Sequence, residues 1–175
     1  MAYKTINIAG IASDSIVDGP GIRVAIFTQG CPHHCEGCHN PSTHSFGTGK
    51  DTTVQELYSI VKSNPIARGV TFSGGEPFAQ CEGLCELAKL LKADGYELAA
   101  YSGYTFDELI QNEVQKALLQ QLDILIDGKF VLAQRNLGLR FRGSENQRII
   151  NVPQSLASSK AVLCTQSRWI GEEIS

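Results

Sequence analysis

The apolar residues of this chain recur with two alternating spacings, and this alternation limits the fold more than any other feature of the sequence. Short runs rich in β-branched and aromatic residues alternate with segments that carry an apolar residue every three or four positions. The short runs predict strands and the longer segments predict helices. The predicted strands cover 22–30, 69–75, 97–103, 123–130 and 148–152, with 161–164 as a further candidate, and the predicted helices cover 52–63, 80–94 and 105–122.

Strands that alternate with helices predict an α/β fold with a parallel sheet of about five to six strands. We expect a single domain over residues 1–175. A complete eight-stranded βα barrel typically needs about 250 residues. This chain has 175, so its sheet should form an open or partial βα barrel. No strand is predicted before residue 22, and residues 40–50, which are polar and contain two glycines, are predicted to form a loop.

The net charge and the first residues of the chain limit the classes of protein to which it can belong. A net charge of −3 argues against a general role in nucleic-acid binding. The first residues contain one lysine and an apolar run broken by polar residues, so they do not resemble a signal peptide. No apolar run is long enough to cross a bilayer. We therefore expect a cytoplasmic protein with no membrane partner, whose cysteines stay reduced.

Three of the six cysteines, Cys31, Cys35 and Cys38, lie within eight residues directly after the first predicted strand. In a reducing compartment this grouping favours metal binding or redox chemistry over disulfides. Iron–sulfur cubanes are normally held by four thiolates, so three thiolates would leave one iron open to a substrate. The other three cysteines are predicted to pack in the core as small apolar residues: Cys81, Cys85 and Cys164.

A zinc site is the rival interpretation, with the three thiolates and one nearby histidine as ligands. Structural zinc sites favour two C-x2-C pairs, and this segment has no second pair. The candidate histidines are His33, His34, His39 and His44. We expect His33 and His34 to be exposed loop residues rather than ligands.

A second motif, SGGEP at residues 73–77, ends the next predicted strand. Two glycines let the backbone approach a small polar ligand closely, and the glutamate carboxylate can accept from an ammonium group. The same residues also suit an ordinary turn from strand to helix. Because parallel strands end at one edge of a sheet, this motif should lie beside the cysteines, together with residues 101–104 and 127–130.

The spacing C-x3-C-x2-C, followed one βα unit later by GGEP, resembles the signature of the radical S-adenosylmethionine enzymes. The resemblance implies that Cys31, Cys35 and Cys38 ligate a [4Fe-4S] cluster. Its open iron would be chelated by the amine and carboxylate of S-adenosyl-L-methionine.

The same resemblance implies where that cofactor lies. Its methionine end would meet Gly74, Gly75 and Glu76. The family often has an aromatic residue directly before the third cysteine, where this chain has Gly37. Packing of the adenine would then rest on the backbone of residues 37–39, including Cys38, with the ring of His39 as a candidate.

Residues 18–31 resemble the opening of glycyl-radical-enzyme activases. Three further segments, 95–103, 122–130 and 140–150, resemble in particular the activating proteins of anaerobic (class III) ribonucleotide reductase. This implies an oxidoreductase that makes a 5′-deoxyadenosyl radical, which abstracts hydrogen from a backbone glycine of the reductase large subunit. A one-electron donor such as reduced flavodoxin would supply the electron. Because the cofactors carry the reaction, no catalytic side-chain acid or base is expected.

Three further site candidates end predicted strands: Ser102, Asp127 and Lys129. The last two resemble an Asp-x-Lys element that approaches the cofactor in some related activases, although charges at strand ends are often only solvated. Three nearby arginines suit either a solvated basic face or a site that docks the reductase or holds the cofactor carboxylate: Arg140, Arg142 and Arg148.

Three other functions stay open. A small radical enzyme, such as a deazapurine-forming synthase, would act on a free molecule without a protein partner. An activase of a different glycyl radical enzyme would share the same motifs. A non-catalytic zinc or electron-carrying module would need only the cysteine loop.

Overall fold

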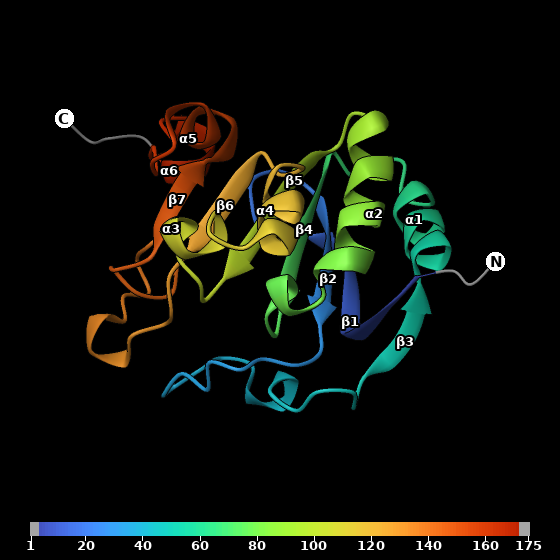
Figure 1. Cartoon of the computed structure of the whole chain (residues 1–175), viewed down its shortest axis with the longest axis horizontal. Coiled ribbons are helices and arrows are strands. Elements are labelled where there is room, and N and C mark those ends of the chain that lie inside the picture. The colour runs from blue at the N-terminus through green and yellow to red at the C-terminus, as the bar shows by residue number, and fades with distance from the viewer. Residues whose placement is uncertain (1–3, 172–175) are drawn as a thin grey trace.

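The computed structural model describes residues 4–171 and shows one seven-stranded sheet with the order β3-β1-β2-β4-β5-β6-β7 (Figure 1). The strands are β1 (Thr5–Ser15), β2 (Arg23–Thr28), β3 (Lys50–Thr53), β4 (Gly69–Gly74), β5 (Glu97–Ser102), β6 (Ile124–Asp127) and β7 (Arg148–Asn151). The helices are α1 (Val54–Lys62), α2 (Cys81–Ala93), α3 (Phe106–Leu109), α4 (Glu113–Leu119), α5 (Val152–Ser158) and α6 (Ser167–Ile170). Among these described residues, no helix is long and apolar enough to cross a bilayer.

The middle of the sheet is parallel and its two sides are antiparallel. β2, β4, β5 and β6 pair in parallel, whereas β1, β3 and β7 pair antiparallel. The α/β class is therefore confirmed, but the expected number of parallel strands is wrong. β7 runs antiparallel because the chain returns from β6 through irregular segments and a short 3-10 helix (Leu132–Gln134) rather than through a crossover helix.

The sequence pattern predicts neither β1 nor β3, and each has a physical reason. The register of β1 against β2 shifts between Ile8 and Gly10 and again between Ala12 and Ser15. Such bulges break the alternation of apolar residues on which strand prediction depends. β3 consists of four polar residues at the edge of the sheet and pairs only with β1, so it carries no apolar signature.

Two further predictions differ from the structure. The helix expected over 105–122 forms two short helices, α3 and α4. Asn112 ends the first stretch and caps the second, since its side-chain oxygen accepts from Val114 N and Gln115 N at 3.0 Å. The strand expected at 161–164 is only an isolated bridge between Leu163 and Ile150.

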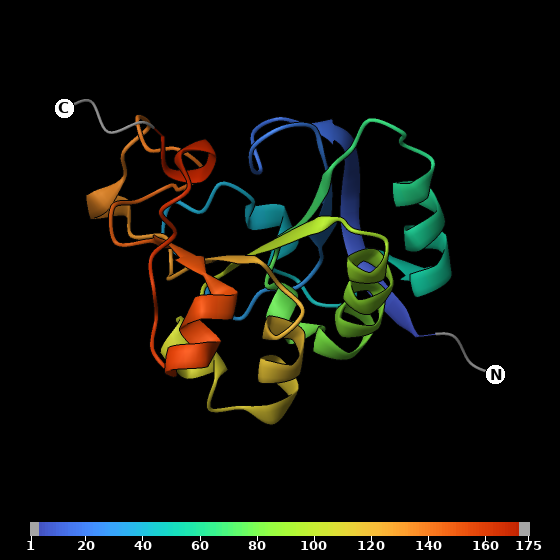
Figure 2. The same cartoon turned by 90° about the horizontal axis from the view of Figure 1, so that it is seen from above.

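The sheet carries apolar cores on both faces. Buried residues of α1, α2 and α4 pack on one face, where these helices lie side by side (Figure 2). A smaller cluster on the opposite face joins Ile126 and Ile149 of the sheet to Trp169 of α6, with Phe141 packed against it. β5 and β6 contribute residues to both clusters, so they read as nearly continuous apolar runs, which explains why they could be predicted.

Candidate metal and cofactor site

The four parallel strands, β2, β4, β5 and β6, have their carboxyl ends on the same side of the sheet. The residues singled out from the sequence directly follow these ends. The cysteine loop, residues 29–49, leaves β2 and lies in the lower part of Figure 1. Gly75 and Glu76 follow β4, Gly103 follows β5, and Gly128 follows β6. The topology therefore brings motifs that are far apart in the sequence together at the carboxyl ends of these strands.

Backbone hydrogen bonds fold the cysteine loop around its thiols. Cys31 N donates to His44 O at 3.1 Å, and Cys38 N donates to Cys35 O at 3.1 Å. Asn40 N donates to the sulfur of Cys38 at 3.4 Å. All three thiols are free, with Cys31 buried and the other two partly buried. The loop thus presents three reduced sulfurs within a short stretch of backbone.

The environment of Cys31 opposes its ionisation. Burial raises the pKa of this thiol, and the Glu76 carboxylate also raises it, while backbone hydrogen bonds from His33 and His34 lower it. Only the thiolate form ligates a metal. The positive charge of a bound metal would therefore have to favour the thiolate form of Cys31.

The donor set fits an iron–sulfur cluster. Within residues 4–171, no three His, Cys, Asp or Glu side chains already stand in a geometry that holds a metal ion. Three free thiols on one loop, with a backbone N–H directed at a sulfur, are nevertheless the ligand chemistry that such clusters use. The histidines that a zinc site would need already have contacts within the chain: His33 with Glu76, His34 with His44, and His39 with Phe130.

The glycine pair of the second motif lets the end of β4 approach the start of the cysteine loop. Gly75 N donates to Thr28 O at 2.7 Å, and Glu76 N donates to Gly30 O at 2.8 Å. A Cβ on Gly74 would lie 2.5 Å from Thr28 N, and one on Gly75 would lie 2.4 Å from Gly30 O. Both glycines are therefore required by this backbone packing, whether or not a ligand is present.

The Glu76 carboxylate is fully buried and already has partners within the chain. It accepts from Ser102 Oγ at 2.9 and 3.0 Å, from Gly103 N at 2.8 Å and from Phe78 N at 3.0 Å. His33 Nε2 lies 2.7 Å from its Oε1. The expectation that His33 is an exposed loop residue is wrong, since its side chain is only 6% exposed. Contact of Glu76 or Ser102 with the cofactor stays a prediction.

Asp127 and Lys129 do not come together in this structure. Asp127 is buried and accepts from Phe106 N at 2.8 Å and from the Arg148 guanidinium at 2.6 and 3.0 Å. The hydrogen bonds to Asp127 raise the pKa of Arg148. Lys129 is exposed. Arg148, one of the three arginines considered from the sequence, is therefore part of an ion pair with Asp127. Contact of Asp127 or Lys129 with the cofactor stays a prediction.

A cavity of about 440 Å³ adjoins the cysteine loop and the end of β4. Its volume lies within the range of small-molecule sites. It is lined by two predicted positions of the loop, Cys38 and His39, and by Gly74. The wall also includes residues that the sequence did not single out as ligand contacts: Asp18, Tyr101, Phe130 and Phe141. Tyr101 and Phe130 lie in the segments 101–104 and 127–130, which the sequence predicted at these strand ends, whereas only the fold reveals that Asp18 and Phe141 meet them there.

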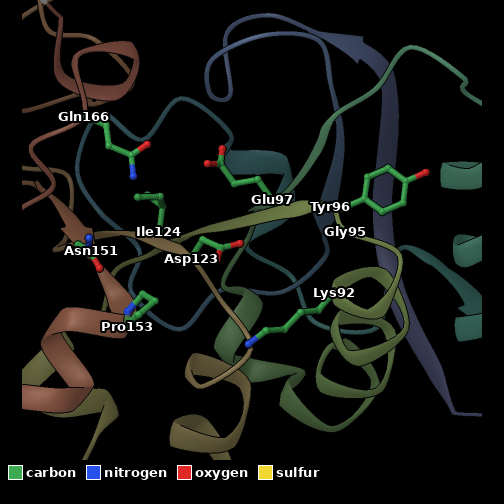
Figure 3. Close-up of a pocket in the computed structure, with 9 residues that line it drawn as sticks. All are labelled: Lys92, Gly95, Tyr96, Glu97, Asp123, Ile124, Asn151, Pro153 and Gln166. Carbon is green, nitrogen blue, oxygen red and sulfur yellow. The ribbon is translucent and has the colours of Figure 1, made fainter.

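Another cavity, of about 390 Å³, lies at the opposite edge of the sheet and is shown in Figure 3. Its walls come from the amino ends of β5 and β6 and include Lys92, Glu97 and Asp123. None of the predicted site residues lines it. The cysteines and the predicted cofactor contacts therefore belong to the other edge.

Comparison with known proteins shows the family of the chain. The family described as a 4Fe-4S single cluster domain matches residues 17–150, which include the cysteine loop and the GGEP motif. The anaerobic ribonucleoside-triphosphate reductase-activating protein of Vibrio cholerae serotype O1 is 37% identical over 142 residues, covering 77% of this chain and 90% of that protein. The chain belongs to the family of anaerobic ribonucleoside-triphosphate reductase-activating proteins.

The resemblance inferred from the sequence is thereby confirmed at the level of this family. The reductase-activating protein of Enterobacteria phage T4 is 37% identical over 153 residues, covering 82% of this chain and 93% of that protein. Among solved structures, QueE from Escherichia coli gives a TM-score of 0.46 at 19% identity, covering 58% of this chain and 54% of that chain. The match to the reductase-activating proteins thus extends over nearly their whole length.

Proposed function

We propose that this chain is a radical S-adenosylmethionine activase that forms the glycyl radical of the anaerobic ribonucleotide reductase large subunit. Membership of the family of reductase-activating proteins is the observation that carries this proposal. The loop of three free thiols beside a cavity of cofactor size supports it. The matched 4Fe-4S family supports the choice of cluster.

In this proposal Cys31, Cys35 and Cys38 ligate a 4Fe-4S cluster and leave one iron open for S-adenosyl-L-methionine. Once bound, the two cofactors would supply the chemistry: one electron from the reduced cluster would cleave a carbon–sulfur bond to release methionine and give the radical that removes a hydrogen atom from the partner glycine. The chain itself binds, orients and shields these groups. A reduced flavodoxin in the cytoplasm is the electron donor that we propose.

The cavity walls suggest how the cofactor is held. The backbone of Gly37 and the residues Cys38, His39 and Gly74 would face it directly, since the last three line the cavity. Behind them, Gly75, Glu76, Ser102, Asp127 and Lys129 surround the same strand ends. We propose that the sheet acts as a single-domain partial barrel whose open side admits a loop of the reductase.

Anaerobic reconstitution of the full chain tests the proposal. The protein should bind iron and acid-labile sulfide, and it should give an organic radical signal by electron paramagnetic resonance when mixed with reductant, S-adenosyl-L-methionine and the reductase. Omission of S-adenosyl-L-methionine is the control that should remove the signal. Zinc without sulfide, or cleavage of the cofactor with no radical on the reductase, would contradict the proposal.

A further inference from the structure

His33 leaves the cysteine loop and inserts between the ends of β4 and β5. Its Nε2 lies 2.7 Å from Glu76 Oε1, although 43 positions separate the two residues. The side chains are 6% and 0% exposed. A buried contact of this kind, between a loop and a residue fixed on the sheet edge, restricts the position of the loop.

The space around His33 is shaped for its ring. A Cβ added to Gly103 would lie 2.4 Å from His33 Cδ2, so the absence of a side chain there makes room for the imidazole. The Tyr104 ring meets the imidazole edge-on, with ring centroids 4.6 Å apart and an interplanar angle of 74°. Glu76, Gly103 and Tyr104 together therefore form a niche for a side chain of the cysteine loop.

The hydrogen bonds of Glu76 are all directed into the protein. A carboxylate offers about four lone-pair positions. Ser102 Oγ, Gly103 N, Phe78 N and His33 Nε2 supply donors to them. Glu76 does not line the cavity beside Cys38. Its carboxylate thus faces the loop and the strand ends rather than the space where a ligand would lie.

We infer that Glu76 is a positioning residue that holds the cysteine loop through His33, instead of contacting the cofactor. The inference rests on the proposed function only in taking the three cysteines as cluster ligands. His33 stands two residues after Cys31, so its anchoring fixes the first thiol relative to the strand ends. The backbone hydrogen bond from Glu76 N to Gly30 O supports the same segment.

Hydrogen exchange of the metal-free full chain tests this anchoring without any cofactor. The variants are His33→Ala and Gly103→Ala, which perturb the niche and leave Glu76 in place. Amides of residues 30–38 should exchange about 10-fold faster or more in both variants. Glu36→Ala is the matched control, because Glu36 is an exposed residue of the same loop; it should leave the exchange unchanged. Equal exchange in His33→Ala and wild type would overturn the inference.

Cluster retention gives a second readout on the reconstituted chain. Iron release to a chelator should be about 10-fold faster in His33→Ala and in Glu76→Gln, because partners that orient metal ligands affect metal affinity by that order. His33→Gln keeps a donor for Glu76 and should restore part of the retention. The double variant His33→Ala, Glu76→Gln should release iron more slowly than the product of the two single effects predicts, because the two variants share the contact between His33 and Glu76.

Affinity for S-adenosyl-L-methionine separates positioning from direct contact. In chains that still hold the cluster, the Kd should change by less than about 3-fold in His33→Ala and Glu76→Gln. A Glu76→Gln variant with normal iron retention and greatly weakened cofactor binding would show that Glu76 is a cofactor ligand. Failure of wild type to assemble a cluster would contradict the proposed function, whereas the exchange experiment would still decide the role of His33.

Discussion

The two ends of the parallel strands differ in how their polar groups are paired. At the amino ends, the buried Arg23 donates to Thr71 Oγ1 at 2.9 Å and to Glu97 Oε1 at 2.8 Å, and it lies 5.2 Å from the centroid of the Trp169 ring. Arg168 also pairs with Glu97. At the carboxyl ends, three thiols within eight residues are free. The buried arginine at the amino ends is thus paired within the chain. The buried carboxylates at the carboxyl ends, Glu76 and Asp127, are paired as well, but the three thiols there are free to bind another group.

The amino ends and the carboxyl ends of the strands therefore have different roles. The ion pairs of the amino ends join β2, β5 and α6, so they stabilise the fold. At the carboxyl ends, a long loop without regular strands is held by specific contacts such as that between His33 and Glu76. Substitutions of the amino-end ion pairs should therefore change stability, and substitutions of the three thiols should change cluster binding.

The largest expected effect is at the carboxyl ends. Cys31→Ala, Cys35→Ala and Cys38→Ala should each lower radical formation on the reductase by about 100-fold or more, because loss of a metal ligand costs at least as much as loss of its supporting partners. Iron content and the organic radical signal measure this effect. Cys85→Ala, which removes a thiol on α2 far along the sequence, is the control and should retain both. Full activity in any of the three variants would contradict the assignment.

The next effect is at the amino ends. Arg23→Met leaves the Glu97 carboxylate without its buried partner and should lower the free energy of unfolding by about 3 kcal/mol. Urea denaturation of the metal-free protein measures the change. Arg168→Met breaks the more exposed pair with Glu97 and should cost less than about 1 kcal/mol. If Arg23→Met lowers the free energy of unfolding no more than Arg168→Met does, the buried ion pair at the amino ends does not stabilise the fold as the account requires.

The sequence locates the carboxyl ends of the parallel strands better than it predicts the whole sheet. Strands buried on both faces appear as apolar runs, so the ends of β2, β4, β5 and β6 and the motifs after them can be located without a structure. β1 escapes prediction because its polar residues serve specific contacts; the side-chain oxygen of Asn7, for example, accepts from Gly49 N at 2.9 Å. β3 escapes because an edge strand needs no apolar residues.

The parts of the site that could not be predicted depend on contacts between distant segments. His33 lies in a polar loop, and nothing near it in the sequence indicates that it is buried against Glu76. The same holds for Asp127, whose partner Arg148 comes from an antiparallel strand that pairs beside it. Residue type and spacing indicate chemistry at such positions, but the partner depends on tertiary packing.

A third prediction concerns the backbone that connects β4 to the cysteine loop. Gly75→Ala should cost about 1–3 kcal/mol of stability, because its Cβ would lie 2.4 Å from Gly30 O and force that segment to move. Cluster content should fall in parallel. Gly10→Ala is the matched control, since a Cβ there meets nothing within 4 Å, and it should change stability by less than about 0.5 kcal/mol. Unchanged stability in Gly75→Ala would argue against the close packing at this point.

The smallest effect is a difference in thiol reactivity. Burial raises the pKa of Cys81 to about 12 and also raises the pKa of Cys31. In the metal-free protein at pH 8, iodoacetamide should therefore modify Cys35 and Cys38 about 10-fold faster or more than Cys31 and Cys81. Mass spectrometry of tryptic peptides measures the four rates. Rapid modification of Cys81 would show that the start of α2 opens in solution.

The most direct test of the central claim follows one hydrogen atom. The reconstituted chain is mixed with reductant, S-adenosyl-L-methionine and an anaerobic ribonucleotide reductase whose glycines carry deuterium at the α-carbon. The account predicts deuterium in the 5′-deoxyadenosine product together with a glycyl radical on the reductase. Product that contains no deuterium, formed without a radical on the reductase, would contradict it.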